Sequence, residues 1–284
     1  MATSKIVKGT DITLSIKKDI QDRIVRFKNT RPKLVTIRIG ESPSEVSYET
    51  SILKKLTPLG IECNPIVLDQ KITQQKFDTI FDKVNNDSSV NGILLLKPVP
   101  KKISLEHVNK TINPIKDVDC IGLTNIAYIY QKEKGFLPCT VEAVQKIIRY
   151  LDINQKGIEI VIVGFSQVIG LPLTLLMIDN GSTVTVCHEY TKDLKKECKR
   201  ADLLISATGV VNLIGKEYVK EGAIVIDVGV NNDTNQHITG DVNSKEVLPL
   251  VKYLTPVPGG VGAVTTYVLA EHVVTAFQKM SFQN

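Results

Sequence analysis

The strongest constraint on the fold is a repeated alternation of short apolar runs with helix-length amphipathic segments. In the first half of the chain the apolar runs cover residues 34–39, 62–68 and 92–96. The helical patterns between them cover residues 48–59 and 74–85. Parallel strands need crossovers of this length, and the helices then pack on both faces of the sheet. The first half is therefore predicted to be an α/β unit.

The second half repeats the rhythm with continuously apolar runs, a pattern typical of strands that are buried on both faces. These runs cover residues 159–163, 183–187, 203–207 and 223–228. The fold class predicted for the whole chain is α/β, with two α/β domains around a cleft and a Rossmann-type parallel sheet in the C-terminal one.

The length of the chain also favours two domains. At 284 residues it exceeds one ordinary domain, since about 150 residues per domain is the common size. We place the boundary near Pro138, because residues 136–140 open a helical pattern that runs to about Leu151. The expected domains are residues 1–137 and 138–264, and the amphipathic segment 265–284 is expected to pack back on the first.

Composition excludes several classes of protein. The net charge of +5 comes from lysines scattered along the chain, so nucleic acid is not implied, although a mild positive bias suits an anionic small molecule. The five cysteines are widely spaced and contain no CxxC pair, which argues against a disulfide framework or a zinc site. We expect no metal centre. The N-terminus lacks a signal-like apolar region, and no apolar stretch approaches the roughly 18 residues of a membrane helix. We expect a cytoplasmic protein with no membrane partner.

A candidate phosphate-binding turn follows the apolar run 159–163. Gly164, Phe165 and Ser166 come directly after this run, and Gly170 precedes an apolar helical segment. A tight turn at a helix N-terminus offers free backbone N–H groups to a pyrophosphate. Ser166 stands where a second glycine is usual, and a plain strand-to-helix turn is the alternative interpretation.

Glu189 follows the next strand, at the distance where an acidic residue meets the adenosine ribose of a bound dinucleotide. A carboxylate accepts hydrogen bonds from ribose hydroxyls but repels a 2′-phosphate, so NAD is favoured over NADP. The alternative is a surface glutamate beside Lys192. Thr208, Val228 and Val230 follow the next two strands, where strand ends line the cofactor crevice.

Taken together, the motifs resemble those of the methylenetetrahydrofolate dehydrogenase/cyclohydrolase family, the bifunctional FolD type, over nearly the whole length. The matching motifs include Pro43 to Tyr48, Gly92-Ile93-Leu94 with Pro98-Val99-Pro100, Lys116-Asp117-Val118-Asp119, Pro138-Cys139-Thr140, Asp227-Val228-Gly229, Gly240-Asp241-Val242 and Thr255 to Gly262. The last of these is close to a family signature.

The resemblance implies an enzyme of one-carbon folate metabolism, a homodimer that binds a tetrahydrofolate derivative mainly with its first domain and NAD(P) with its second. Carried over by position, Tyr48 packs against the aromatic part of folate and Asp119 hydrogen-bonds the pterin, whose edge presents N–H donors. The substrate site would also include Pro258, Gly259 and Gly260. Thr140 and Thr265 would join the dinucleotide site.

Two departures from the family pattern bear on the chemistry. The family has a lysine four residues after the tyrosine, where this chain has Ile52, and a glutamine that orients that lysine, where this chain has Leu96. Hydrolysis of a methenyl cation needs a group that titrates, which neither aliphatic side chain supplies. Hydride transfer does not require such a titrating group from the protein, because the cofactor supplies the chemistry. Cyclohydrolase activity is therefore expected to be lost or weak.

Three readings stay open. The first is a dehydrogenase that has largely lost the hydrolase step, and the second is a bifunctional enzyme in which Lys54 or Lys97 replaces the missing lysine. The third is a catalytically silent folate- or dinucleotide-binding protein. The chain retains Asp119 and the run from Thr255 to Gly262, which argues against this third hypothesis. Milder departures from the family are Cys120 for glycine, Val141 for proline, Phe165 for arginine or alanine, and Ala263-Val264 for Pro-Met.

Overall fold

The computed structural model describes residues 5–27, 30–233 and 237–282. The chain divides into two compact units. One, called the N-terminal unit, comprises Ser15–Cys139 with the residues from Thr266 onward, and the other, called the C-terminal unit, comprises Thr140–Thr265 with the chain up to Leu14. Helices α1 (Gly9–Ile24), α6 (Cys139–Tyr150) and α10 (Val261–Ser281) run across these divisions.

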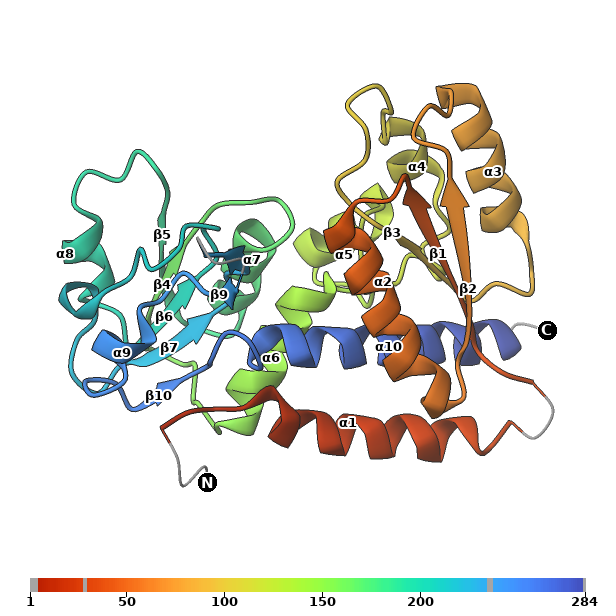
Figure 1. Ribbon diagram of the computed structural model, residues 1–284. Helices are drawn as coiled ribbons and strands as arrows, with labels where there is room; N and C mark the ends of the chain where they lie inside the picture. The colour runs from red at the N-terminus through yellow and green to blue at the C-terminus, as the bar shows by residue number, and fades with distance from the viewer. Residues whose placement is uncertain (1–4, 28–29, 234–236, 283–284) are drawn as a thin grey trace. The chain divides into compact units, whose positions relative to one another are not determined.

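The N-terminal unit is built on a three-stranded parallel sheet. Its strands are β1 (Lys33–Ile39), β2 (Glu62–Leu68) and β3 (Gly92–Leu95), in the order β2-β1-β3. Helix α2 (Pro43–Leu56) connects β1 to β2 through a short 3-10 turn, η1 (Thr57–Leu59), and α3 (Gln74–Asn86) connects β2 to β3. Figure 1 shows α2 and α3 on opposite sides of this sheet. Two further helices, α4 (Glu106–Thr111) and α5 (Leu123–Gln131), follow β3.

The α3 face of this sheet is an apolar core. Phe77, Phe81 and Val84 recur at helical spacing on α3 and pack against Val35 and Ile37 of β1. Alternation along a strand sends Leu34, Thr36 and Arg38 to the other face, where α2 lies. The two faces of β1 thus differ in character: one buries the aliphatic residues Val35, Ile37 and Ile39, and the other carries the buried polar residues Thr36 and Arg38.

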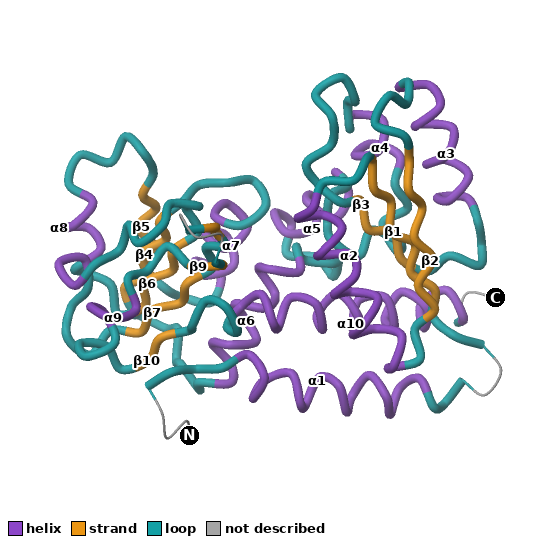
Figure 2. Tube along the Cα trace, viewed as in Figure 1, coloured by secondary structure: helices purple, strands orange, loops and turns teal. Residues whose placement is uncertain are grey.

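The C-terminal unit contains a five-stranded parallel sheet of order β10-β7-β6-β4-β5, which confirms the Rossmann-type sheet (Figure 2). Its strands are β4 (Glu159–Val163), β5 (Thr183–Cys187), β6 (Leu203–Ser206), β7 (Ile224–Asp227) and β10 (Tyr253–Leu254). The smaller elements are α7 (Gly170–Asp179), α8 (Leu194–Cys198), η2 (Lys216–Tyr218), α9 (Ser244–Val247) and the antiparallel pair β8 (Asn231–Asn232) and β9 (Ile238–Thr239).

One prediction about this sheet is wrong in part. Strands β6 and β7 are buried throughout and β4 nearly so, as continuous apolar runs predict. In β5, however, only Cys187 is buried. The reason is topological, because β5 is the edge strand of the sheet, and an edge strand has no neighbour on one side to cover it.

Candidate functional site

The turn after β4 requires glycine at two positions. Gly164 has a φ of +115°, and a Cβ on it would lie 2.3 Å from the Ala207 carbonyl oxygen. A Cβ on Gly170, at the start of α7, would lie 2.0 Å from the Gly164 carbonyl oxygen. Both distances are shorter than any real contact, so a side chain at either position would force the backbone apart. Two segments of main chain therefore approach each other here as closely as glycine allows.

Ser166 closes this turn in place of the usual second glycine. Its Oγ accepts a hydrogen bond from the Ile169 N–H at 3.1 Å, and its carbonyl accepts one from the Leu171 N–H at 3.0 Å. The sequence after β4 thus folds into a compact loop that leads into α7, an arrangement that suits a phosphate group at a helix N-terminus.

A cavity of about 740 Å³ opens beside this turn, within the C-terminal unit. It is lined by Val163, Gly164, Phe165, Ser166, His188, Glu189, Tyr190, Thr191, Leu194, Ala207, Thr208, Val210 and Leu213. These residues come from the ends of three adjacent parallel strands, β5, β4 and β6, together with the loops that follow them. A ligand site at the carboxyl ends of parallel strands is the general expectation for such sheets.

Five of the predicted cofactor residues line this cavity: Gly164, Phe165, Ser166, Glu189 and Thr208. The other four, Thr140, Val228, Val230 and Thr265, are not among its lining residues. Val228 is buried with its N–H bonded to the Ser206 carbonyl at 2.8 Å, whereas Val230 is exposed. The Thr265 hydroxyl donates to the Val261 carbonyl within α10.

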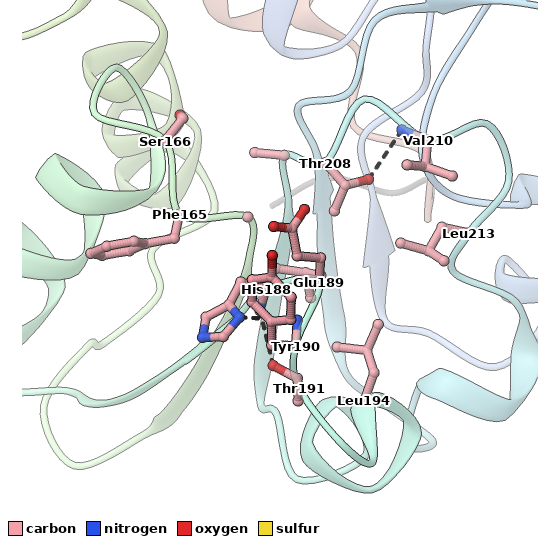
Figure 3. Close-up of a pocket in the computed structure, with 13 residues that line it drawn as sticks. Phe165, Ser166, His188, Glu189, Tyr190, Thr191, Leu194, Thr208, Val210 and Leu213 are labelled. Atoms are coloured by element: carbon pink, nitrogen blue, oxygen red, sulfur yellow. Dashed lines mark hydrogen bonds between the residues drawn. The ribbon is translucent and has the colours of Figure 1, made fainter.

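Glu189 lies in the middle of the cavity wall in Figure 3, between the Phe165 turn and Thr208. It is exposed and forms no ion pair with Lys192 or any other residue of the described chain. Its neighbour His188 has a structural part in the loop, because the His188 Nδ1 accepts from the Tyr190 N–H at 3.2 Å and the His188 N–H donates to Thr191 Oγ1 at 2.9 Å. The carboxylate of Glu189 is therefore available to a ligand.

Two buried aspartates, Asp241 and Asp227, accept hydrogen bonds from backbone N–H groups of the C-terminal unit. Neither residue was assigned a role from the sequence. Asp241 accepts hydrogen bonds from the Thr208 N–H at 2.6 Å and the Gly209 N–H at 3.1 Å, which fixes the loop after β6. Asp227 accepts from the Gly229 and Val242 N–H groups, both at 2.9 Å. Burial raises the pKa of Asp227 to about 6, although these backbone hydrogen bonds act in the opposite direction.

In the N-terminal unit, Tyr48 of α2 lies near Asp119, which belongs to the loop between α4 and α5. Burial of the Tyr48 hydroxyl raises its pKa, and the Asp119 carboxylate and the Cys139 thiol raise it further. Tyr48 as a whole residue is nevertheless 39% exposed, so part of it is open to a ligand. Asp119 is held by the Cys139 N–H, which donates to its Oδ1 at 3.2 Å.

The loop that carries Asp119 shows why glycine suits position 120, where this chain has cysteine. Cys120 has a φ of +55°, in the left-handed region that favours glycine. The buried Asp117 carboxylate holds this loop by accepting from the Ile121 and Gly122 N–H groups, both at 2.9 Å. Glycine is thus the unstrained residue at position 120, and cysteine occupies it at a conformational cost of about 1 kcal/mol.

The two positions of the lysine and glutamine pair are both buried and apolar. Ile52 is 0% exposed on the inner face of α2, and Leu96 is 3% exposed just after β3. The two candidate replacements, Lys54 and Lys97, are both exposed. Lys54 lies two residues beyond Ile52 on the helix, so it faces away from the buried side that Ile52 occupies.

The remaining predicted substrate residues, Pro258, Gly259 and Gly260, belong to the C-terminal unit. Gly259 has a φ of +97° and its carbonyl accepts from the Gly9 N–H at 2.8 Å. A Cβ on Gly260 would lie 2.4 Å from the Pro256 carbonyl oxygen. The glycine pair in this run is therefore required by backbone geometry.

No cluster of three histidine, cysteine or acidic side chains in the described residues could hold a metal ion. Among the described helices, none combines the length and the apolar character that crossing a bilayer requires.

Comparisons with known proteins identify the family of the chain. Residues 7–119 match the catalytic domain of tetrahydrofolate dehydrogenase/cyclohydrolase, and residues 138–281 match its NAD(P)-binding domain. A bifunctional protein FolD of Clostridium botulinum (strain 657 / Type Ba4) is 41% identical over 281 residues, which cover 98% of this chain and 100% of that protein.

Solved structures give the same result. The bifunctional FolD enzyme of Campylobacter jejuni superposes with a TM-score of 0.93 at 35% identity, covering 98% of this chain and 100% of that one. The Trypanosoma brucei methylenetetrahydrofolate dehydrogenase-cyclohydrolase (FolD), solved with an NADP cofactor and inhibitor, gives a TM-score of 0.93 at 28% identity and covers both chains completely. The chain therefore belongs to the tetrahydrofolate dehydrogenase/cyclohydrolase family of one-carbon folate metabolism, with a Rossmann-type NAD(P)-binding domain.

Proposed function

We propose that this protein is a methylenetetrahydrofolate dehydrogenase that uses NAD in preference to NADP and has lost most or all cyclohydrolase activity. One observation carries the proposal. The chain keeps Tyr48 beside Asp119, while both positions of the proton-transfer pair hold buried aliphatic side chains, Ile52 and Leu96. The groups for binding folate are present, and the groups for hydrolysis are not.

The C-terminal cavity fits a dinucleotide. The turn at Gly164 and Gly170, which any Cβ would block, leads closely into the start of α7, and the N-terminus of a helix is a favourable place for a pyrophosphate. When bound, the nicotinamide ring accepts a hydride from the substrate. Glu189 would accept hydrogen bonds from the adenosine ribose, and Thr208 would close the other wall of the cavity. We include Thr140, Val228, Val230 and Thr265 in the proposed cofactor site by their family positions.

Folate binding is assigned to Tyr48, Asp119, Pro258, Gly259 and Gly260. The exposed ring of Tyr48 offers an apolar surface to the aromatic part of folate. The Asp119 carboxylate already accepts one backbone N–H, and its remaining lone pairs can accept from the pterin. In this proposal these residues would bind and orient the substrate.

Loss of the hydrolase step follows from the same residues. A water must be activated and a proton moved between folate nitrogens, and general acid–base groups contribute about a hundredfold to ten-thousandfold to such steps. Ile52 and Leu96 cannot exchange protons. The exposed positions of Lys54 and Lys97 count against the alternative, a fully bifunctional enzyme in which one of them serves as the missing base.

We further propose that residues 1–137 with the C-terminal helix 265–284 form the folate domain, that residues 138–264 form the dinucleotide domain, and that the active protein is a cytoplasmic homodimer. Size-exclusion chromatography with light scattering tests the dimer. A mass of one chain at micromolar concentration would contradict it.

The proposal is tested by following reduced cofactor at its absorbance maximum with methylenetetrahydrofolate as substrate and with NAD or NADP in turn. Formation of NADH at a rate well above the enzyme-free control supports a dehydrogenase. Absence of turnover with both cofactors, in a protein that still binds tetrahydrofolate, would instead favour a catalytically silent binding protein.

A further inference from the structure

A buried ion pair joins β1 to α2 in the N-terminal unit. Arg38 Nε donates to Glu49 Oε2 at 3.0 Å, and the two side chains are only 8% and 6% exposed. The other carboxylate oxygen of Glu49 accepts from the Thr36 hydroxyl at 2.5 Å. A second guanidinium nitrogen of Arg38 donates to the Gly40 carbonyl. Both carboxylate oxygens of Glu49 are thus bound to β1.

This cluster lies between β1 and α2, near the two aliphatic replacements, Leu96 just after β3 and Ile52 on α2. Thr36 of β1 pairs in register with Leu94 of β3, and the Leu96 N–H donates to the Ile37 carbonyl at 2.9 Å. Leu96 therefore stands beside Arg38 on the same face. On α2, Ile52 comes three residues after Glu49, so both belong to the buried face of the helix.

The stability of the fold alone does not explain why this cluster is charged. The desolvation of two buried charges offsets much of their attraction, and well-packed apolar replacements are often equally stable. What an ion pair provides that an apolar contact does not is direction, since hydrogen bonds weaken steeply when their angles change. Two directed contacts from β1, from the Thr36 hydroxyl and from Arg38 Nε, therefore determine where Glu49 lies, and with it the helix to which Glu49 belongs.

Glu49 directly follows Tyr48 in the sequence, so the position of one determines that of the other. The Tyr48 hydroxyl lies close enough to Asp119 for that carboxylate to raise its pKa. A small rotation or slide of α2 on β1 would move the ring of Tyr48 relative to Asp119. Apolar contacts alone resist such a slide less, because they have little directional preference.

We propose that Arg38, Thr36 and Glu49 are positioning residues, which fix α2 on β1 and thereby hold Tyr48 in place for the aromatic part of folate. The inference rests on the proposed function, in which Tyr48 and Asp119 bind the substrate. It assigns a specific role in folate affinity to a buried pair that does not itself touch the ligand.

A single substitution of Arg38 would not test this idea cleanly. It would leave Glu49 buried without its cation, and Glu45, one turn earlier on the same face, is also buried with one carboxylate oxygen lacking a hydrogen-bond partner in the described chain. Such a variant would unfold for electrostatic reasons. The informative variant is the all-apolar triple substitution Thr36→Val, Arg38→Met and Glu49→Leu.

The experiment measures three quantities in the purified full chain: the thermal midpoint, the Kd for tetrahydrofolate and the Kd for NAD. We expect the triple variant to melt within a few degrees of the wild type, to keep its NAD affinity and to bind tetrahydrofolate at least about tenfold more weakly. Asp82→Asn, which breaks the partly exposed pair with His107 in the same unit, is the matched control and should change neither Kd.

Tyr48→Ala, made in both backgrounds, separates positioning from a merely structural role. If the cluster places Tyr48, the alanine substitution should raise the tetrahydrofolate Kd strongly in the wild type and much less in the triple variant, because coupled residues are not additive. Equal effects in both backgrounds, or an unchanged Kd in the stable triple variant, would overturn the proposal. A wild type that binds no tetrahydrofolate would refute the proposed function instead.

If the triple variant does not fold, Glu49→Gln replaces it. Glutamine keeps the shape and can still accept from Arg38, but it loses the charge that strengthens both contacts. Positioning predicts a rise of about threefold in the tetrahydrofolate Kd with NAD binding unchanged, and a smaller effect of Tyr48→Ala than in the wild type. Wild-type values for both would overturn the proposal.

Discussion

Replacement of Glu189 by serine is expected to change which dinucleotide the enzyme prefers. Glu189 lines the C-terminal cavity at the end of β5 and has no ion-pair partner among the described residues, so its charge acts on the ligand without being neutralised. In NADP a 2′-phosphate would occupy the space beside it. Serine removes the repulsion and leaves a small hydroxyl in its place.

The size of the effect follows from the exposure of Glu189. Two unit charges about 5 Å apart repel by about 0.8 kcal/mol in bulk water and by about 3 kcal/mol at the lower effective dielectric of a protein surface. An exposed side chain lies toward the first value, and a phosphate with more than one charge raises it. We therefore expect the wild type to favour NAD by at least about tenfold in kcat/KM.

Glu189→Ser should raise kcat/KM with NADP about tenfold and lower it with NAD, because the hydrogen bonds to the ribose are lost. The assay is initial-rate formation of NADH or NADPH from methylenetetrahydrofolate over a range of cofactor concentrations. Glu221→Ser removes the same charge from an exposed position of the same unit, outside the cavity lining, and is the control for a general change in net charge. Wild-type kinetics with NADP equal to or better than those with NAD would refute the reasoning, as would an identical response of the two serine variants.

Three further predictions concern residues of the folate and dinucleotide sites. Asp119→Ala should weaken tetrahydrofolate binding by about 1–3 kcal/mol, because pterin donors are left unpaired. Calorimetry should show that NAD binding is unchanged. An unaltered folate affinity would show that Asp119 only helps to form the turn. Gly164→Ala should abolish NAD binding and lower the thermal midpoint, since its Cβ would lie 2.3 Å from the Ala207 carbonyl oxygen, and wild-type NAD affinity would contradict the close approach of the two loops. Ile52→Lys with Leu96→Gln should gain measurable hydrolysis of methenyltetrahydrofolate and Ile52→Lys alone should gain less, because nothing orients the new ammonium group; a single variant as active as the double would show that the glutamine is unnecessary.

The regular part of the fold could be predicted from the sequence because it depends on local patterns. The strands 62–68, 159–163 and 183–187 are where the apolar runs placed them. Helix α1 was not predicted, although Ile12, Ile16 and Ile20 recur at helical spacing and are all buried, a pattern that would have revealed it. The exposure of β5 could not be predicted, because strand order determines which strand lies at the edge.

The candidate site could be predicted where a short sequence motif determines the local backbone conformation by itself. Gly164 and Gly170 were recognised by their spacing after a strand, and the structure shows the close backbone approach that requires them. The role of Asp241 could not be predicted. Asp241 holds the Thr208 loop from 33 residues away in the sequence, and no local pattern records such a tertiary contact. The pairing of Arg38 with Glu49 was hidden for the same reason, since a charged residue inside an apolar strand shows its partner only when the helix is packed on the sheet.

The most direct test of the account follows the absorbance of methenyltetrahydrofolate with and without the wild-type enzyme, at a pH where spontaneous hydrolysis is slow. Because Ile52 and Leu96 are buried aliphatic residues, we predict that enzyme which oxidises methylenetetrahydrofolate with NAD will leave the rate of methenyl decay at the spontaneous value. Clear acceleration of that decay by the wild type, abolished by Lys54→Ala or Lys97→Ala, would contradict the account and show that a displaced lysine performs the hydrolysis.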